Sequence, residues 1–146
     1  MNDAKQRLIE RNQGVIDEFR ANAGVVGGRY EGRRLLLLTT VGVKSGRPHT
    51  SPLGCTEEGD AYYIFGAVGG APRHPAWYYN ILGNPRVTVE VGTDKFEALA
   101  IVLEGADRER VYSNHVAQSP AFAEYEQKMT RVIPVVRLTR LSSPGA

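Results

Sequence analysis

The chain has 146 residues, of which 42% are hydrophobic and 23% are charged, a composition typical of one globular domain with its own core. A formal net charge of +2 is too small to indicate a nucleic-acid-binding protein, and no apolar run approaches the length of a membrane span. The single cysteine, Cys55, cannot form an internal disulfide, and together with a polar, mixed-charge N-terminus it leads us to expect a cytoplasmic protein.

The first predicted element is a helix within residues 1–24, which Asp3 can cap and Gly24 can end. Its apolar side chains recur at helical spacing and form one rough stripe, made of Leu8, Val15, Ile16 and Phe19. The rest of the helix carries charges of both signs, so we expect the stripe to pack on the remainder of the domain. Contact with a membrane is an alternative that the sequence does not support.

Six strands are predicted after this helix, because apolar or alternating runs recur between turn residues. They cover residues 35–40, 49–56, 61–67, 86–91, 95–104 and 133–138. Pro52 interrupts the second run, which indicates an edge strand or a bulge. Because most connections have hairpin length, neighbouring strands should be antiparallel, and this many can close into a small barrel. The predicted fold class is therefore α+β, a six-stranded antiparallel barrel with flanking helices in one domain spanning 1–146.

Three further helices are predicted between or after these strands. A short one begins at Pro75 and stops just before Gly83, and another runs from Asp107 to about Gln118. Ser119-Pro120 begins the last one, which carries Phe122, Tyr125 and Met129. We expect the tail, residues 142–146, to be flexible.

One candidate site is the turn Gly42-x-Lys44-Ser45-Gly46-x-Pro48, between the first two predicted strands. Its backbone N–H groups, hydroxyl and ammonium group could together bind an anion. The spacing differs from that of a nucleotide-binding P-loop, and an ordinary hairpin turn is the alternative. Basic residues cluster around this strand and turn, either as an anion-binding edge or as a solvated face, and they are Arg29, Arg33, Arg34, Lys44 and Arg47.

A second candidate site is the segment Gly69–Asn80, which reads GGAPRHPAWYYN. The pair Gly69-Gly70 allows close approach of a ligand to the backbone, and the aromatic helix with Trp77 follows at once. A loop, a helix cap and a core tryptophan are the structural alternative.

Metal and covalent chemistry have no support in the sequence. His49, His74 and His115 are far apart, and none stands at metal-ligand spacing from a cysteine or a carboxylate. No nucleophile motif is present, and we interpret Cys55 as a small apolar residue of a strand. A protein of this kind would position a cofactor and depend on it for its chemistry.

Four stretches in this order resemble the deazaflavin-dependent nitroreductase family, and the resemblance extends from about Val15 to Arg140. They are LLLLTTVGVKSGRPHTSPL, GGAPRHPAWYYN, NPRVTVEV and YEQKMTRVIPVV. The resemblance implies a split β-barrel like that of flavin-mononucleotide-binding oxidoreductases. It also implies coenzyme F-420, an 8-hydroxy-5-deazaflavin with a phospholactyl-polyglutamate tail, in a family that is mainly actinobacterial.

The resemblance assigns cofactor-binding roles to two stretches of the chain. The residues concerned are Lys44, Ser45, Gly46, Arg47, His49, Thr50, Ser51, Pro52, Leu53, Ala67, Val68, Gly69, Gly70, Ala71, Trp77 and Asn80. The turn 44–46 would bind the phosphate and acidic tail, with Arg29, Arg33, Arg34 or Arg47 reaching the glutamates.

The same resemblance places the deazaflavin ring against residues 69–71, where small side chains let it approach the backbone. Trp77 and Asn80 would support this part of the site. Tyr125 would close the substrate side, as a stacking face or as a proton donor.

Two departures from the family pattern bear on specificity. His49 stands where members often carry arginine, which implies a weaker phosphate contact. Ala67-Val68 replaces a serine-lysine pair of well-studied nitroreductases, which makes the site more apolar and argues against nitroimidazole reduction.

The expected activity is hydride transfer from reduced coenzyme F-420 to an apolar electrophile: a quinone, an enone or lactone, or a nitroaromatic. A split barrel that binds flavin mononucleotide or haem is one alternative, and a non-catalytic deazaflavin carrier is another. Either a monomer or a homodimer is compatible with the sequence.

Overall fold

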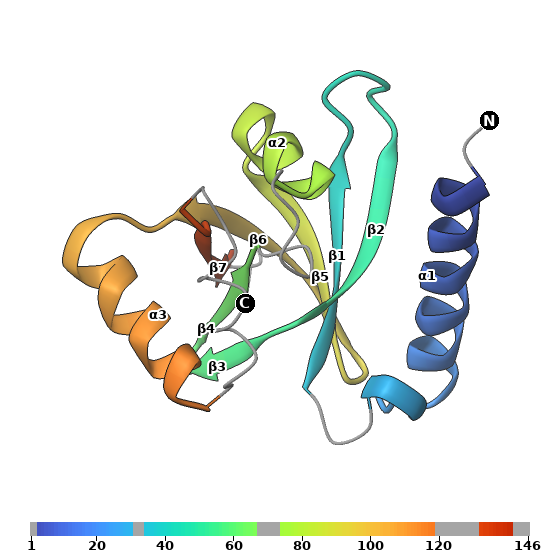
Figure 1. Cartoon of the computed structure of the whole chain (residues 1–146), viewed down its shortest axis with the longest axis horizontal. Helices are drawn as coiled ribbons and strands as arrows, with labels where there is room; N and C mark the ends of the chain where they lie inside the picture. Colours follow the sequence, from blue (N-terminus) through green and yellow to red (C-terminus); the bar gives the residue numbers. More distant parts are fainter. Residues whose placement is uncertain (1–2, 31–33, 67–73, 119–131, 142–146) are drawn as a thin grey trace.

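A computed structural model describes residues 3–30, 34–66, 74–118 and 132–141 (Figure 1). Its main feature is a curled antiparallel sheet of seven strands in the order β2-β1-β5-β6-β7-β4-β3. The strands are β1 (Leu35–Val41), β2 (Pro48–Gly54), β3 (Thr56–Glu58), β4 (Ala61–Phe65), β5 (Arg86–Val91), β6 (Asp94–Val102) and β7 (Val135–Arg140). The helices are α1 (Asp3–Ala21), η1 (Gly28–Tyr30), α2 (Ala76–Gly83) and α3 (Gly105–Gln118).

The sheet closes on itself because its two edge strands follow one another in the chain. Only Cys55 separates β2, at one edge, from β3, at the other. The Cys55 N–H donates to the carbonyl of Arg34 (3.1 Å) at this crossing point. The prediction of a single strand over 49–56 was wrong, because this run contributes to both edge strands of the sheet. The predicted count of six strands was wrong for the same reason. Pro52 does lie in an edge strand, as predicted.

Strand β1 is buried on both faces over most of its length, as its apolar run predicts. Leu36 and Leu38 point into the barrel, where they join Trp77 of α2 in the main core. Leu35 and Leu37 point outward and pack against α1 in a separate cluster.

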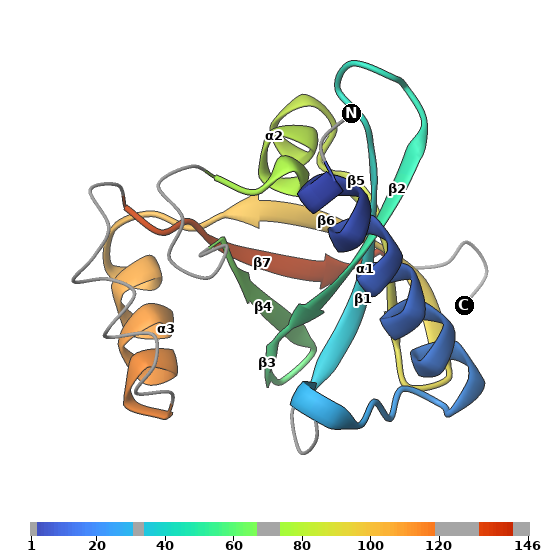
Figure 2. The ribbon, with the colours of Figure 1, turned by 45° about the vertical axis from the view of Figure 1, so that its right-hand side comes forward.

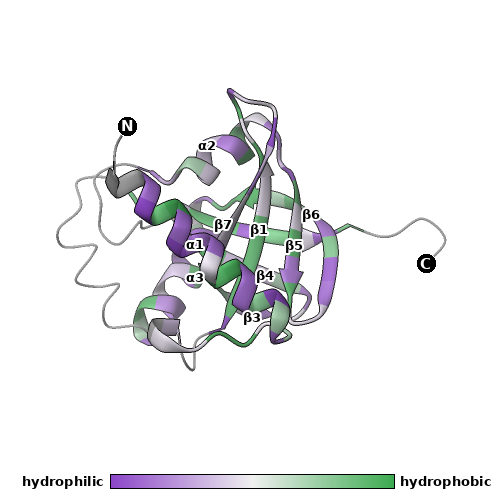
Figure 3. Cartoon of the chain, turned by 90° about the vertical axis from the view of Figure 1, so that its right-hand side faces the viewer, coloured by the Kyte–Doolittle hydropathy of each residue, from purple (hydrophilic) through white to green (hydrophobic). Residues whose placement is uncertain are grey.

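Helix α1 covers the outer face of β1 through Ile16 and Phe19, both almost fully buried. Figure 3 shows it in front of the sheet, with hydrophilic patches broken by hydrophobic ones on its visible side. The turn after the helix ends at Gly24, whose φ of +91° only glycine adopts readily. A Cβ at this position would lie 2.8 Å from the Cα of Gly92, so the helix end packs directly on the β5–β6 turn.

Helix α2 lies beside the tip of the β1–β2 hairpin, and α3 lies at the far side of the sheet (Figures 1 and 2). Both predicted helices are confirmed, with small differences at their ends. Pro75 caps α2 rather than beginning it, and Gly83 is its last residue. The predicted helix from Ser119 and the tail 142–146 lie outside the described residues.

Candidate functional site

The hairpin between β1 and β2 ends in a tight turn made by residues 42–47. The Gly42 N–H donates to the carbonyl of Arg47 (2.8 Å), and the Gly46 N–H donates to the carbonyl of Gly42 (2.9 Å). Gly46 has φ of +69°, a left-handed conformation that strongly favours glycine. The glycine pattern of the sequence therefore does produce a turn that holds its backbone in one conformation.

The side chains of this turn are exposed and carry positive charge. Lys44, Ser45, Arg47 and His49 are all exposed, and residues 35–54 contain no Asp or Glu. The Ser45 hydroxyl accepts a hydrogen bond from the Arg47 N–H (3.1 Å), and it also lies 3.1 Å from Nε2 of His49. Cationic groups, a hydroxyl and an imidazole in one exposed turn are suited to a phosphate or carboxylate.

Gly42 is required for this arrangement by a close approach rather than by its backbone angles. A Cβ built on Gly42 would lie 2.5 Å from Oγ of Ser45 and 2.8 Å from Nε2 of His49. Any other residue would have to displace both side chains. Gly42 thus preserves the contact between the serine and the histidine.

Asn80 attaches α2 to the hairpin turn with both ends of one buried amide group. Its Oδ1 accepts the Val43 N–H (3.1 Å), and its Nδ2 donates to Oγ1 of Thr40 (2.9 Å). Thr40 and Asn80 are the two buried polar side chains of the described core. The sequence analysis missed Thr40, although its inward position after Leu36 and Leu38 could have indicated a buried hydroxyl that needs a partner.

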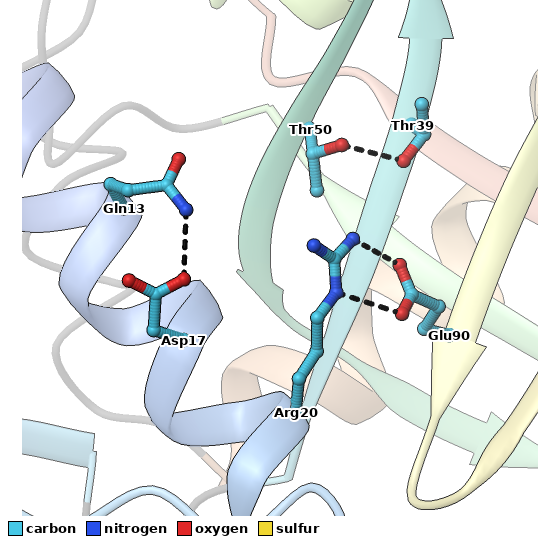
Figure 4. Close-up of polar contacts among 6 residues, drawn as sticks. All are labelled: Gln13, Asp17, Arg20, Thr39, Thr50 and Glu90. Carbon is cyan, nitrogen blue, oxygen red and sulfur yellow. Dashed lines mark hydrogen bonds and ion pairs between the residues drawn. The ribbon is translucent and has the colours of Figure 1, made fainter.

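The predicted site residues of β2 divide between the two faces of the strand. His49, Ser51 and Leu53 lie opposite Thr40, Leu38 and Leu36 of β1, which point into the barrel. Thr50 points the other way and bonds Thr39 through their hydroxyls at 2.8 Å (Figure 4). Pro52 shares that outer face, because it lies opposite Leu37. The structure therefore brings only the first group of β2 residues to the side where Asn80 lies.

Trp77 lies beneath the candidate site as a core residue, with 6% of its surface exposed. It packs in the main cluster with Leu36, Leu38 and Ile81, which agrees with a supporting position.

Gly66 and Pro75 flank the segment 67–73 and lie close together. A Cβ on Gly66 would be 3.2 Å from the Pro134 ring and 3.4 Å from Cδ of Pro75, and the Gly66 N–H donates to the Pro134 carbonyl (3.0 Å). Gly66 and Pro75, which lie on either side of the segment 67–73 in the chain, are therefore both close to the N-terminus of α2. The predicted site residues Ala67, Val68, Gly69, Gly70, Ala71 and Tyr125 lie outside the described residues.

The basic cluster predicted from the sequence does not gather at one place. Arg34 precedes β1 and so lies at the opposite end of that strand from Lys44 and Arg47. There it forms an ion pair with Glu57 (2.8 Å). The side chain of Arg29 and all of Arg33 lie outside the described structure. Of the cluster, Lys44 and Arg47 are the members that the structure brings to the turn.

Cys55 is not placed for nucleophilic chemistry. Burial raises the pKa of its thiol to about 11, and the nearby Arg34 only partly offsets this. The thiolate is the reactive form, so this thiol is poorly reactive near neutral pH. Among the described residues, no three His, Cys, Asp or Glu side chains gather closely enough to hold a metal ion.

No helix in the described ranges combines the length and the apolar character that crossing a membrane requires.

Residues 11–140 match the protein family described as F420H(2)-dependent quinone reductase. An F420H(2)-dependent quinone reductase of Mycobacterium tuberculosis is 35% identical over 144 residues, which cover 92% of this chain and 97% of the relative. A putative F420H(2)-dependent quinone reductase of Mycobacterium bovis matches with the same identity and coverage.

Solved structures show the same relationship. An F420-H2 dependent reductase is 39% identical, with a TM-score of 0.67 over 73% of this chain and 94% of that chain. A domain-swapped dimer is 36% identical, with a TM-score of 0.68 over 93% of this chain and 97% of that chain. The heme storage protein HutZ of Vibrio cholerae, at 21% identity and a TM-score of 0.57, covers 88% of this chain and 89% of its own and shares the fold. These likenesses confirm the predicted split barrel.

Proposed function

The chain belongs to the family of F420H(2)-dependent quinone reductases, and on this basis we propose that it transfers hydride from reduced coenzyme F-420 to an apolar, electrophilic small molecule. The observation that carries the proposal is family membership over nearly the whole chain together with the basic turn of the β1–β2 hairpin. The same relationship supports the predicted class of enzyme, an oxidoreductase.

The residues of the turn fit the tail of the coenzyme. That tail carries a phosphate and glutamates, and the turn offers an ammonium group, a guanidinium group and a hydroxyl with no carboxylate on the same hairpin. We assign the phosphate to Lys44 and Ser45 and the glutamates to Arg47. Charge-assisted bonds of this kind are the strong ones among protein hydrogen bonds. Asn80 holds the turn against α2, so that the backbone carrying these groups is already positioned before the coenzyme binds.

When bound, the coenzyme supplies the hydride from C5 of its deazaflavin ring. The part of this chain that would receive the ring is the surface beside Gly66 and the N-terminus of α2, above Trp77. The core under that surface is apolar, and exclusion of water from the bound ring would favour hydride transfer over side reactions. Tyr125 stays our candidate for the proton that the reduced acceptor needs.

A quinone is the acceptor class that we favour. It is the acceptor in the name of the relatives, and Ala67-Val68 makes the predicted site more apolar than that of the nitroimidazole reductases. An enone or lactone and a nitroaromatic rank after it.

Acceptor reduction with reduced coenzyme F-420 tests this proposal. Purified protein is mixed with the reduced coenzyme and a quinone, an enone or a nitroaromatic, and oxidation of the coenzyme is followed. The proposal predicts the fastest turnover with the quinone. Coenzyme binding without reduction of any acceptor would instead establish a carrier, and a protein that purifies yellow or red from a host lacking the deazaflavin would establish a flavin or haem protein.

We further propose that the chain forms a homodimer, because a relative 36% identical to it is a domain-swapped dimer. Light scattering on the purified protein tests this, and a mass of 16.0 kDa at all concentrations would contradict it.

A further inference from the structure

Ser45 and His49 form a hydroxyl–imidazole pair at the hairpin turn. Their reactive atoms, Oγ and Nε2, are 3.1 Å apart. Both side chains are exposed, as are those of Lys44 and Arg47 in the same turn. The close approach at Gly42 leaves room for this pair and for no larger residue.

The hydrogen-bonding capacity of the serine limits what the pair can do. A hydroxyl donates one hydrogen bond and accepts two. Oγ of Ser45 already accepts the Arg47 N–H (3.1 Å). If Nε2 of His49 carries no proton, it accepts from Ser45, and the hydroxyl has no donor left. If Nε2 carries a proton, as in the imidazolium or in the neutral Nε2–H tautomer, it donates to Oγ, and the Ser45 O–H is free to donate elsewhere.

We propose that His49 takes up a proton from the buffer when the phosphate of the coenzyme binds, so that the Ser45–His49 pair binds this anion in the imidazolium form. Protonation adds a positive charge to the turn, and it fixes Nε2 as a donor to Oγ, so that the Ser45 O–H can donate to the phosphate. This inference rests on the proposed function, because it assigns a role within the same anion site.

The surroundings of His49 favour such coupling. The charged residues of the same turn are Lys44 and Arg47, and a bound anion would add a negative charge that favours the imidazolium form. Strand β1 has no ionisable side chain, and α2 adds only the phenols of Tyr78 and Tyr79. Helix α1 packs against the other side of the hairpin, on the face to which Thr50 points. An imidazole changes charge between pH 5 and 8, so the coupling falls in the physiological range.

Calorimetry of coenzyme F-420 binding in two buffers of different ionisation enthalpy counts the protons taken up. At pH 7 we expect wild type to take up about 0.5 proton more than His49→Gln. Protons exchanged by the coenzyme itself are the same for both proteins, so the difference isolates His49. The affinity of wild type should fall about threefold to tenfold from pH 6 to pH 8 relative to that of His49→Gln.

Two further variants separate this role from a merely structural one. His49→Arg is charged at every pH and should bind tightly at pH 8 without additional proton uptake. Ser45→Ala should weaken binding at both pH 6 and pH 8.5, because it removes the hydroxyl, but it should leave the proton uptake by His49 in place. Equal proton uptake by wild type and His49→Gln would overturn the inference although the coenzyme binds, whereas absence of coenzyme binding to any variant would overturn the proposed function.

Discussion

At the scale of single residues, Asn80 has the clearest structural consequence in the site. One buried amide satisfies a backbone N–H of the turn and the hydroxyl of Thr40, so the position of α2 and that of the hairpin depend on the same side chain. A buried polar group left without its partner costs more than the hydrogen bond itself contributes.

Replacing Asn80 by alanine is expected to lower the free energy of unfolding by about 1–3 kcal/mol, because Thr40 and Val43 both lose their buried partner. Thr40→Val removes only one of the two bonds and should cost less. Urea denaturation of the two single variants and the double variant measures this. If their effects add, the three residues do not act as one network.

Cys55 provides a second test at this scale. A thiol with a pKa of about 11 should react with an alkylating agent at pH 8 on the order of 100-fold more slowly than in the unfolded chain. Mass spectrometry of native and urea-unfolded protein after iodoacetamide treatment follows the reaction. Equal rates would show that the thiol is not held in a desolvated position.

The sequence predicted those features of the site that depend on neighbouring residues in the chain. The turn 42–47 was predicted because glycine, serine and lysine identify a turn by themselves. The bond between Thr40 and Asn80 was not, because it joins positions 40 residues apart, and nothing local indicates such a partner. Arg34 was placed in the wrong cluster for a related reason. It is next to β1 in sequence, but its partner Glu57 comes from the strand that follows the crossing.

At the scale of elements, α1 is attached to the sheet by its apolar stripe and by one bidentate ion pair. Nε and Nη2 of Arg20 donate to the two carboxylate oxygens of Glu90 on β5, at 3.1 and 2.9 Å (Figure 4). These bonds lower the pKa of Glu90 more than its partial burial raises it. The pair therefore stabilises the fold above the ordinary carboxyl pKa of about 4.3 and loses this contribution as pH falls below it.

Arg20→Gln should lower the free energy of unfolding by about 0.5–1 kcal/mol at pH 7, because half of the arginine side chain is exposed and solvent screens the pair. The difference from wild type should shrink as pH falls below about 4, where Glu90 takes up a proton. Arg7→Gln, an exposed arginine on the same helix, is the control. A difference that stays constant from pH 7 to pH 3 would exclude the ion pair as its cause.

Helices and strands were predicted well where apolar residues recur at regular spacing. They were predicted poorly where one continuous run pairs with two different strands. The α1 stripe identified Ile16 and Phe19 correctly, although Leu8 in the same stripe is 49% exposed. The run 49–56 looked like one strand because its composition does not change at Cys55. The change lies in its partners, β1 on one side of Cys55 and β4 on the other.

At the scale of the whole molecule, the barrel brings together chain segments that are distant in sequence. The candidate site combines the β1–β2 hairpin with α2 and with Gly66 and Pro134, which lie next to each other at one end of the β4–β7 pairing. Antiparallel pairing between neighbours could be predicted from short connections. The pairing of β1 with β5 and of β4 with β7 could not, because these strands are separated by long stretches of chain.

Basic side chains lie at both ends of the barrel. Lys44 and Arg47 lie at the hairpin end, whereas Lys95, at the start of β6, lies at the opposite end beside Glu90. Lys44 and Lys95 are both exposed lysines, so they form a matched pair for testing where an anionic ligand binds.

The most direct test of the account is therefore a binding titration with coenzyme F-420 and with flavin mononucleotide, using wild type, Lys44→Gln and Lys95→Gln. We predict that wild type prefers coenzyme F-420, that Lys44→Gln weakens its binding about tenfold or more through loss of a charge-assisted hydrogen bond, and that Lys95→Gln binds like wild type. Preference for flavin mononucleotide, or unchanged coenzyme affinity in Lys44→Gln, would contradict the account.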